Sequence, residues 1–460
     1  MPGMSDSTST GRRVLLLALP ALAQQYLFFV IQQYDQYLAR HFSPDHQAAL
    51  TTANYLYWFI SSYSVVVSAG ATALVGRLTG GGDFRLAGRA TGQAMLLAVG
   101  FGLLATIVGL LGLPTLMRLL ELQGSAPVIA NEYLLPLTLI LTVQMVETGG
   151  IACLVGAGDT RTGLMVLAGV AAVNVPTAWV LSGGGGPALD YGFVGIALGT
   201  AVSHTLGGLA VLILLMRGRS GLKVSVADLR PDFAILKRLL RVSIPAGIDS
   251  LSIACCQLWF LSIVNRLGNA ASAAHGIAIR WEALGYLAGA AFGASASAVV
   301  SQNLGARRPD LASRGGWAAF AQGGGLMCAM GVLFFTLAGP MCEMYSPNNP
   351  AVVALAVPPL RLIAFAMPGV AAWIILTSAL RAAGDTRVPV LFSWLGFLGV
   401  RIPLAFLLTA KEIDFGSWGT VPGYDLGLIG AWVAMVSDIY VRGVLFTLRY
   451  AGGRWKRVVV

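Results

Sequence analysis

The strongest constraint on this chain is a series of uncharged apolar runs, each about 20 residues long. A helix of that length crosses the roughly 30 Å hydrocarbon core of a bilayer. Of the 460 residues, 56% are hydrophobic and only 11% are charged, far fewer charges than a soluble chain carries. The runs do not alternate polar with apolar residues, so they predict membrane helices rather than a barrel.

Hydropathy over windows of about 19 residues predicts twelve spans, six in each half of the chain. In the first half they cover 14–38, 52–76, 90–112, 130–153, 163–182 and 192–216. In the second half they cover 240–263, 272–300, 316–340, 352–380, 388–410 and 427–448. The first run resembles a signal peptide after Arg12-Arg13, but it continues to Ala39, so we expect a complete helix. The expected fold class is all-α, with twelve transmembrane helices in two six-helix bundles.

The basic residues between the spans predict the orientation of the chain in the membrane. With the N-terminus inside, the inner segments hold 22 Lys and Arg residues and the outer segments hold 4. Basic residues collect on the cytoplasmic side of membrane proteins. We therefore expect a multi-pass protein of the bacterial inner membrane with both termini in the cytoplasm, and we attribute the net charge of +10 to topology rather than to nucleic-acid binding.

Several short motifs recur at an offset of about 225 residues. Ala-Gly-Asp-Thr-Arg occupies 157–161 and again 383–387, and Pro20 early in the first span is matched by Pro245. Because each half has an even number of spans, the two halves have the same orientation, which predicts a pseudo-two-fold axis along the membrane normal. The expected organisation is an N-terminal bundle at 1–216, a cytoplasmic connector at 217–241 and a C-terminal bundle at 242–460.

Two inner segments have patterns that local structure can explain. Within the connector, apolar residues between Asp232 and Arg241 fit a short amphipathic helix on the inner membrane surface, although a solvated linker fits equally well. In the repeated motif, Gly158 and Gly384 are expected to end one helix and the following Asp or Thr to cap the next. We favour this capping role over direct contact with a substrate.

Ionisable side chains inside spans are costly, by roughly 2.5–3.5 kcal/mol each, and are therefore candidates for function. Asp438 has Arg442 one helical turn later, which favours a structural ion pair. Glu282 and Arg280 are two residues apart and cannot face each other on one helix. For His204 we favour a hydrogen-bonded packing role over proton transfer.

Asp35 differs because its own helix offers no cation within a turn. A buried carboxyl of this kind can take up and release a proton, so we favour a functional role over a structural one. Glu147 is expected near the inner end of its span, where water is close, and Asp249 deeper. Asp249, Glu282 and Tyr55 are candidates for lining a substrate cleft, although Tyr and Trp also anchor helices at the membrane interface.

Other classes of site have no pattern in this sequence. The five cysteines show no zinc or disulfide spacing, and we interpret them as small packing residues; they are Cys153, Cys255, Cys256, Cys328 and Cys342. No Walker loop occurs, which excludes an ATP-driven exporter subunit. Four histidines are too few for a membrane enzyme with clustered His or acids. We expect no enzyme activity, no metal site and no cofactor.

Several motifs together resemble the multidrug and toxic compound extrusion (MATE) family of secondary transporters, over nearly the whole chain. Pro20 is followed fifteen residues later by Asp35, as in the family's first helix. The stretches Ala274-His-Gly-Ile-Ala278 and Ser301-Gln-Asn-Leu-Gly-Ala306 are close to a family segment, and the doubled Gly-Asp-Thr-Arg is typical. Each motif is weak alone, but their order and spacing make the resemblance strong.

The resemblance implies export of small amphipathic, often cationic compounds in exchange for protons or sodium. Its ion-coupling residues correspond here to Asp35, Asn174 and Thr200. Some members carry an acid four residues after that asparagine, where this chain has Ala178. Fewer carboxylates around the site favour protons over sodium.

The remaining partners and alternatives follow from the same comparison. The expected partners are a small-molecule substrate and the lipid bilayer, and the expected state is a monomer. The alternative function is a flippase for lipid-linked or polysaccharide precursors in the same superfamily, which would meet phosphates with basic residues in its cleft. The arginines inside the predicted spans are Arg280, Arg361, Arg401 and Arg442.

Overall fold

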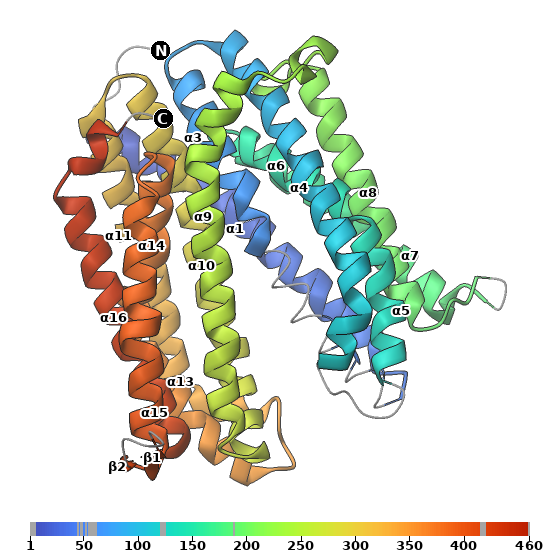
Figure 1. Cartoon of the computed structure of the whole chain (residues 1–460), viewed down its shortest axis with the longest axis vertical. Helices are drawn as coiled ribbons and strands as arrows, with labels where there is room; N and C mark the ends of the chain where they lie inside the picture. Colours follow the sequence, from blue (N-terminus) through green and yellow to red (C-terminus); the bar gives the residue numbers. More distant parts are fainter. Residues whose placement is uncertain are drawn as a thin grey trace. The chain divides into compact units, whose positions relative to one another are not determined.

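The computed structural model of the protein describes residues 6–43, 46, 49–50, 53, 62–119, 126–186, 189–414 and 420–458, and these are almost entirely helical (Figure 1). The first half forms α1 (Asp6–Ala39), α3 (Val65–Gly80), α4 (Phe84–Leu119), α5 (Ala126–Leu139), α6 (Leu141–Gly156), α7 (Thr160–Trp179), η1 (Val180–Gly184) and α8 (Val194–Met216). The short helices η2 (Arg219–Gly221) and η3 (Val226–Leu229) follow.

The second half is also helical apart from one small hairpin. Its helices are α9 (Phe233–Asn265), α10 (Asn269–Gly305), α11 (Pro309–Thr336), α12 (Ala338–Glu343), α13 (Pro350–Ala382), α14 (Arg387–Trp394), η4 (Leu395–Arg401), α15 (Ile402–Thr409), α16 (Gly427–Ala451) and η6 (Arg454–Arg457). The antiparallel strands β1 (Glu412–Asp414) and β2 (Thr420–Pro422) pair Glu412 with Pro422 between α15 and α16.

Most predicted spans correspond to helices of membrane-crossing length. Among the described residues, ten helices or helix combinations are long and apolar enough to cross a membrane, and α5 with α6, bent by 50°, form an eleventh. The predicted span 52–76 falls mainly outside the described residues, and its described part enters α3. The all-α membrane fold class is thus supported by helix length and composition.

The described structure divides into two compact units. We call Leu19–Gly247 with Ser301–Arg308 the N-terminal unit, and Met1–Ala18, Ile248–Val300 and Pro309–Val459 the C-terminal unit. The chain changes unit within α1 next to Pro20 and within α9 next to Pro245. Proline removes a backbone donor from a helix, so both helices are weakened near the point where the chain changes unit. The compact units do not follow the halves 1–216 and 242–460 throughout, because the first segments of α1 and α9 belong to the other unit.

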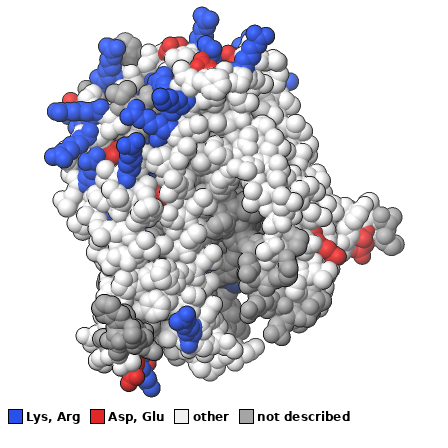
Figure 2. All heavy atoms as spheres, in the orientation of Figure 1, with Lys and Arg blue, Asp and Glu red and all other residues white. Residues whose placement is uncertain are grey.

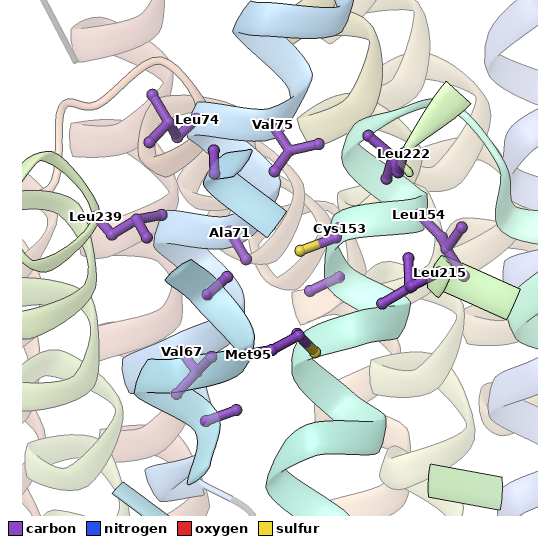
Figure 3. Packing of buried hydrophobic residues seen from close by; sticks show 14 of the residues in the cluster. Val67, Ala71, Leu74, Val75, Met95, Cys153, Leu154, Leu215, Leu222 and Leu239 are labelled. Carbon is purple, nitrogen blue, oxygen red and sulfur yellow. The ribbon is translucent and has the colours of Figure 1, made fainter. Parts of the chain in front are cut away.

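The core of the N-terminal unit is built from α3, α4, α6 and α8 (Figure 3). Leu74 and Val75 from α3, Met95 from α4, Cys153 from α6 and Leu215 from α8 are all buried there. Small residues allow the close contacts that membrane helices need: a Cβ on Gly156 would lie 2.8 Å from the carbonyl oxygen of Thr72. This packing fixes α6 and α8, which carry part of the candidate site.

The core of the C-terminal unit lies around α13, which packs against both α11 and α16. Trp432 and Phe446 of α16 are fully buried, as is Phe397 of η4. Gly369 of α13 and Gly443 of α16 face each other, since a Cβ on Gly443 would lie 3.1 Å from the Cα atom of Gly369. This close approach holds α16 and its buried charges in the middle of the unit.

The predicted short amphipathic helix in the connector is wrong. Residues 233–241 are the beginning of the continuous helix α9. Ile235, Leu239 and Val242 are buried in the core of the N-terminal unit, and their spacing of four and three residues continues one helical face. No helix breaker separates Asp232 from Pro245, so the amphipathic turn extends directly into the membrane span.

The repeated Gly-Asp-Thr-Arg motif does form helix boundaries. Gly158 and Gly384 both adopt positive φ angles, of 85° and 84°. Asp159 caps α7 by accepting a 2.9 Å hydrogen bond from the backbone N–H of Thr162. In the second copy, Thr386 precedes α14 without a side-chain capping bond, and Asp385 instead accepts a 2.8 Å hydrogen bond from Arg449 Nε. The capping prediction is confirmed for the first copy and is wrong for the second.

All five cysteines are free. Cys153, Cys256 and Cys342 are buried, in agreement with a packing role, whereas Cys255 and Cys328 are exposed. The prediction that all five are packing residues is therefore wrong for these two, because their helices α9 and α11 turn those side chains away from the unit's interior.

Exposed Lys and Arg residues gather beyond the ends of helices in each unit (Figure 2). In the N-terminal unit Arg217, Arg219 and Lys223 are exposed after α8. In the C-terminal unit Arg454 and Arg457 are exposed after α16. Basic residues beyond the ends of membrane helices are the distribution that a bilayer favours.

Candidate functional site

Asp35, Asn174 and Thr200, from three different helices, meet inside the N-terminal unit. Thr200 Oγ1 on α8 donates to Asp35 Oδ2 on α1 at 3.4 Å. Asn174 Nδ2 on α7 donates to Thr200 Oγ1 at 3.1 Å. All three side chains are buried. Thr200 therefore lies between the carboxylate and the amide, and Asp35 contacts Thr200 rather than Asn174.

Close packing of α7 against α8 brings these groups within reach of one another. A Cβ on Gly199 would lie 2.6 Å from the Cα atom of Ala178, so only glycine allows this approach. Asn174 lies one helical turn before Ala178, and Thr200 directly follows Gly199. The glycine thus sets the distance at which the two polar side chains can bond.

Two oxygen atoms of this cluster have no hydrogen-bond partner. They are Oδ1 of Asp35 and Oδ1 of Asn174, and both are buried. Buried polar atoms are nearly always bonded, so unsatisfied ones indicate a ligand, a water or a functional role. A carboxylate with one free oxygen can accept a proton, and the set of three side chains offers oxygen atoms to a small cation.

A second buried polar pair lies in the same unit. His204 Nδ1 on α8 is 2.8 Å from Glu147 Oε2 on α6. The side chains are only 7% and 5% exposed. The expectation that Glu147 lies near water is therefore wrong, because α8 covers it. The hydrogen-bonded role predicted for His204 has a specific partner that the sequence did not indicate.

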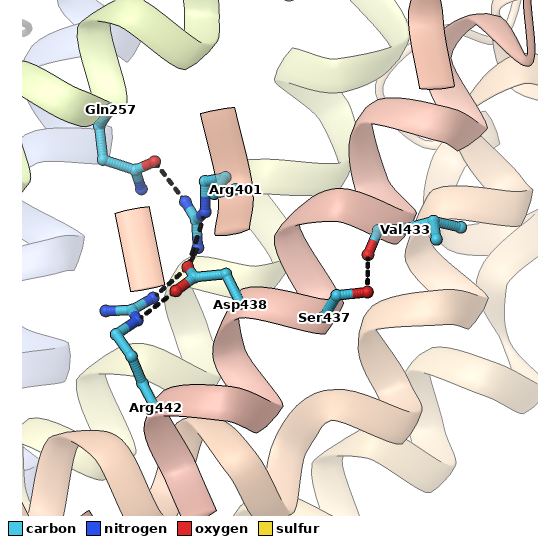
Figure 4. Close-up of polar contacts among 6 residues, drawn as sticks. All are labelled: Gln257, Arg401, Val433, Ser437, Asp438 and Arg442. Atoms are coloured by element: carbon cyan, nitrogen blue, oxygen red, sulfur yellow. Dashed lines mark hydrogen bonds and ion pairs between the residues drawn. The ribbon is translucent and has the colours of Figure 1, made fainter. Parts of the chain in front are cut away.

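The C-terminal unit holds a buried cluster of charges (Figure 4). Asp438 of α16 pairs with Arg442 at 2.6 Å, which confirms the predicted ion pair one turn apart. Arg401 of η4 also pairs with Asp438, at 2.8 Å, and donates to Gln257 Oε1 at 2.7 Å. Two of the arginines inside spans thus share one acid.

Aromatic rings surround the same cluster. The guanidinium carbon of Arg442 lies 3.8 Å from the centre of the Trp373 ring and 4.3 Å from that of Phe397. Arg401 lies 4.3 Å from the Phe397 ring centre. Cation–π contacts offset part of the desolvation of a buried cation. The arrangement holds the two arginines in place, and both oxygen atoms of Asp438 already accept hydrogen bonds from them.

The three cleft candidates have different outcomes. Asp249 is fully buried and forms an ion pair with Arg381 of α13, which leaves its Oδ1 without a partner. Glu282 is partly exposed on α10 and interacts electrostatically with Arg401. Tyr55 lies outside the described residues. Asp249 and Glu282 belong to the C-terminal unit, so the structure does not bring them together with Asp35 in one unit.

Sequence reasoning missed the partners that come from other helices. Arg401, Arg381 and Glu147 each pair with a residue at least 37 positions away. The available signal was indirect: an acid or base inside a span needs a counterion. Glu147 and Arg401 were such candidates, whereas Arg381 was expected in an inner segment after the span 352–380. Helical spacing identifies only partners on the same helix, such as Asp438 and Arg442.

The family model for MatE matches residues 20–180 and 245–407 of the chain. These two matches cover more than half of the sequence, and their starts are separated by the offset of the repeated motifs. The chain belongs to the MatE family. This membership identifies a membrane transporter, and not an enzyme.

Relatives and solved structures agree with this MatE assignment. The chain is 24% identical over 456 residues to the "Probable multidrug resistance protein NorM" of Thermotoga maritima, covering 98% of this chain and 94% of that protein. A MOP superfamily transporter from Pyrococcus furiosus has the same fold, with a TM-score of 0.87, 17% identity and 98% of both chains covered. An outward-facing multidrug resistance MATE family transporter has a TM-score of 0.85, 17% identity and coverage of 99% and 100%. These likenesses confirm the expected two-bundle fold class of this MatE protein.

Proposed function

We propose that this MatE protein is a secondary antiporter that exports small amphipathic, often cationic compounds in exchange for protons. The observation that carries the proposal is the buried carboxylate of Asp35, which has one oxygen bonded to Thr200 and the other without a partner. The name of the Thermotoga maritima relative, a multidrug resistance protein, supports the class of substrate. The absence of a Walker loop from the sequence points to an ion gradient as the energy source.

Proton binding at Asp35 would change the bonds within the cluster. The charged carboxylate accepts a hydrogen bond from Thr200, and Thr200 in turn accepts one from Asn174. A neutral carboxyl accepts such bonds more weakly. Protonation therefore favours a different packing of α1 against α7 and α8, and a substrate that binds one packing better is released in the other.

The composition of the cluster supports protons over sodium as the coupling ion. Asp35 is its only carboxylate, and Ala178, one turn after Asn174, is buried and has no side-chain oxygen to offer. Hard cations bind several oxygen ligands, often more than one of them charged. A proton needs a single acceptor, which the free oxygen of Asp35 supplies.

We infer further that both termini lie in the cytoplasm and that the protein resides in the bacterial inner membrane. The support is the ratio of 22 basic residues in the proposed inner segments to 4 in the outer ones. A reporter enzyme fused after Val460 should be active only in the cytoplasm. Activity on the outer side would contradict this topology.

Two of the four arginines inside the predicted spans are held in ion pairs, which does not favour the flippase alternative. A flippase needs basic groups free to meet a phosphate. Arg401 and Arg442 are instead buried and bonded to Asp438. We therefore propose drug export alone.

The proposal is tested by measuring dye accumulation in a pump-deficient host that expresses the wild type or Asp35→Asn. The wild type should lower ethidium accumulation, a protonophore should abolish this effect, and removal of sodium should not. Asp35→Asn, at equal expression, should accumulate ethidium like the empty vector, because a neutral amide cannot release a proton. Wild-type export by Asp35→Asn, or export that follows the sodium gradient, would contradict the proposal.

A further inference from the structure

The pair of Glu147 and His204 has no role in the function proposed above. Both side chains are buried, and His204 Nδ1 lies 2.8 Å from Glu147 Oε2. A histidine inside a membrane span is costly and rare, and a carboxylate even more so. Ser, Asn or Gln could supply a hydrogen bond at lower cost in desolvation. The presence of two groups that can each bind a proton suggests a use for that proton.

The pair is connected to Asp35 through α8. Thr200 and His204 are four residues apart and therefore lie on one face of that helix. Thr200 bonds to Asp35, and His204 is close enough to interact electrostatically with the same carboxylate. Along α8, His204 is about 6 Å nearer than Thr200 to the connector at 217–241. On the proposed topology, the pair lies between Asp35 and the cytoplasm.

Few other charged groups are available to influence this pair. Among the described residues of the helices that pack on α8, Arg161 lies in the first turn of α7, Glu132 on α5 and Arg219 on η2, and all three are exposed. The helices that pack on α6 carry Arg77 on α3 and exposed Arg85 and Arg89 near the start of α4. Tyr133 on α5 is buried against Phe193 at the opposite end of α8. Besides its partner Glu147, His204 interacts electrostatically with Asp35 of α1.

The packing around the pair holds it in one position. A Cβ on Gly207 would lie 3.0 Å from Glu147 Oε1 and 2.6 Å from Cγ2 of Val170. Glycine therefore allows α8 to approach both α6 and α7 at this level. Glu147 is buried, with His204 as its hydrogen-bonding side chain.

We propose that Glu147 and His204 form a second proton-binding site, which passes the coupling proton between Asp35 and the cytoplasm. This proposal rests on the proposed function. The transfer is a simple proton exchange: the O–H bond of the Asp35 carboxylic acid breaks, and an N–H or O–H bond forms within the pair. The total charge of the three groups stays constant. Release of the proton from the pair to cytoplasmic water then returns both groups to their starting protonation state for the next cycle.

The decisive comparison is between net transport and exchange in proteoliposomes that contain purified protein. Net ethidium transport driven by a pH gradient needs complete proton transfer. Exchange of ethidium for ethidium at equal pH needs only alternating access. The first variant is His204→Asn, which can keep a hydrogen-bond donor near the position of Nδ1. The second is Glu147→Gln, which keeps an acceptor but whose neutral amide does not bind a proton near neutral pH. His275→Asn is the matched control, because His275 is also buried and hydrogen-bonded, to Trp432 in the C-terminal unit.

We expect His204→Asn and Glu147→Gln to lower gradient-driven ethidium transport by about 100-fold, as for loss of a positioned proton-transfer group. They should keep ethidium exchange close to the wild-type rate. The pH dependence of gradient-driven transport should also change for these two variants. His275→Asn should leave both rates and the pH profile unchanged.

Other outcomes separate this proposal from the previous one. If Asp35→Asn abolishes gradient-driven transport while His204→Asn and Glu147→Gln transport at wild-type rates with an unchanged pH profile, the second site is refuted and the role of Asp35 stands. If His204→Asn and Glu147→Gln lower exchange and net transport equally, the pair is structural and the proposal is also refuted. If Asp35→Asn itself transports like the wild type, the proposed function is contradicted, and the second site that rests on it is contradicted as well.

Discussion

Thr200 and His204 lie one turn apart on α8, and their side chains bond to acids from two different helices. Thr200 donates to Asp35 of α1, whereas His204 pairs with Glu147 of α6. One face of α8 therefore contacts both Asp35 and Glu147, the two buried carboxylates of the candidate site. A movement of α8 relative to either helix would change the surroundings of both acids.

Replacing the Thr200 hydroxyl should reduce coupled export. Thr200→Val keeps the shape of the side chain but removes the donor to Asp35 and the acceptor for Asn174. A hydrogen bond to a charged group contributes about 1.5–3 kcal/mol, so export driven by a pH gradient should fall by roughly 10- to 100-fold. Thr200→Ser keeps the hydroxyl and should retain most of the activity. Equal rates for Val and Ser variants in a dye-efflux assay would argue against the role of this bond.

Loss of the Asp438 charge should lower stability more than transport. Asp438→Asn leaves Arg401 and Arg442 buried without a carboxylate, and breaking such a cluster costs about 3–5 kcal/mol. Arg442→Met leaves one arginine paired with Asp438 and should cost less. Melting temperatures in detergent would compare the two variants. Turnover per folded molecule should fall less for Asp438→Asn than for Asp35→Asn, and the reverse order would contradict the structural role of Asp438.

Gly396 should be essential for packing of the same cluster. A Cβ at this position would overlap Asp438 Oδ1 and lie 2.6 Å from Cδ of Arg442, whereas a Cβ on Gly399 would first meet Leu395 at 3.3 Å. Gly396→Ala should therefore destabilise the protein by about 1–3 kcal/mol. Gly399→Ala, in the same helix, is the matched control and should be neutral or slightly stabilising. Equal melting temperatures for the two variants would show that the cluster adapts to the extra atom.

Asp159, in the loop before α7, should make the stability of the N-terminal unit sensitive to acid. Burial alone would raise the pKa of this carboxyl, but hydrogen bonds from Ser220 and Thr162, with Arg219 nearby, lower it overall. A folded-state pKa below the unfolded value of about 3.9 means that the carboxylate stabilises the fold above pH 4. This contribution disappears as the pH falls through the folded-state pKa.

The comparison of wild type with Asp159→Asn tests this pH dependence, because asparagine caps a helix about as well as aspartate but does not titrate. The wild type should melt at a higher temperature near neutral pH. The difference should shrink as the pH falls below about 4. A difference that stays constant down to pH 3 would contradict the prediction.

The helical architecture could be predicted because each span is encoded locally. Apolar length decides whether a helix can cross the membrane, and ten helices or helix combinations in the described part of the chain reach that length. The pair of Asp438 and Arg442 was predictable for the same reason, since four residues equal about one turn. The connector was predicted incorrectly because its surface-like pattern continues without a break into α9.

The candidate site was only partly predictable. The lack of a cation near Asp35 on its own helix identified this residue from its sequence surroundings, but only the resemblance to a family indicated Asn174 and Thr200. The partners of Glu147, Asp249 and Arg401 could not be identified from either source. Pairing across helices depends on the rotation and depth of each helix, which many distant contacts set together.

By itself, the sequence determined that this protein crosses the membrane many times, with basic residues gathered in alternate loops and one unpaired carboxyl in its first span. These features could be identified because the cost of placing charge in hydrocarbon acts on each segment separately. Only the tertiary structure decided that α8 joins Asp35 to the pair of Glu147 and His204, and that two arginines share Asp438. Glycines such as Gly199 and Gly207 allow helices to approach closely enough for these bonds, and the register of that approach is a property of the packed units rather than of any single helix.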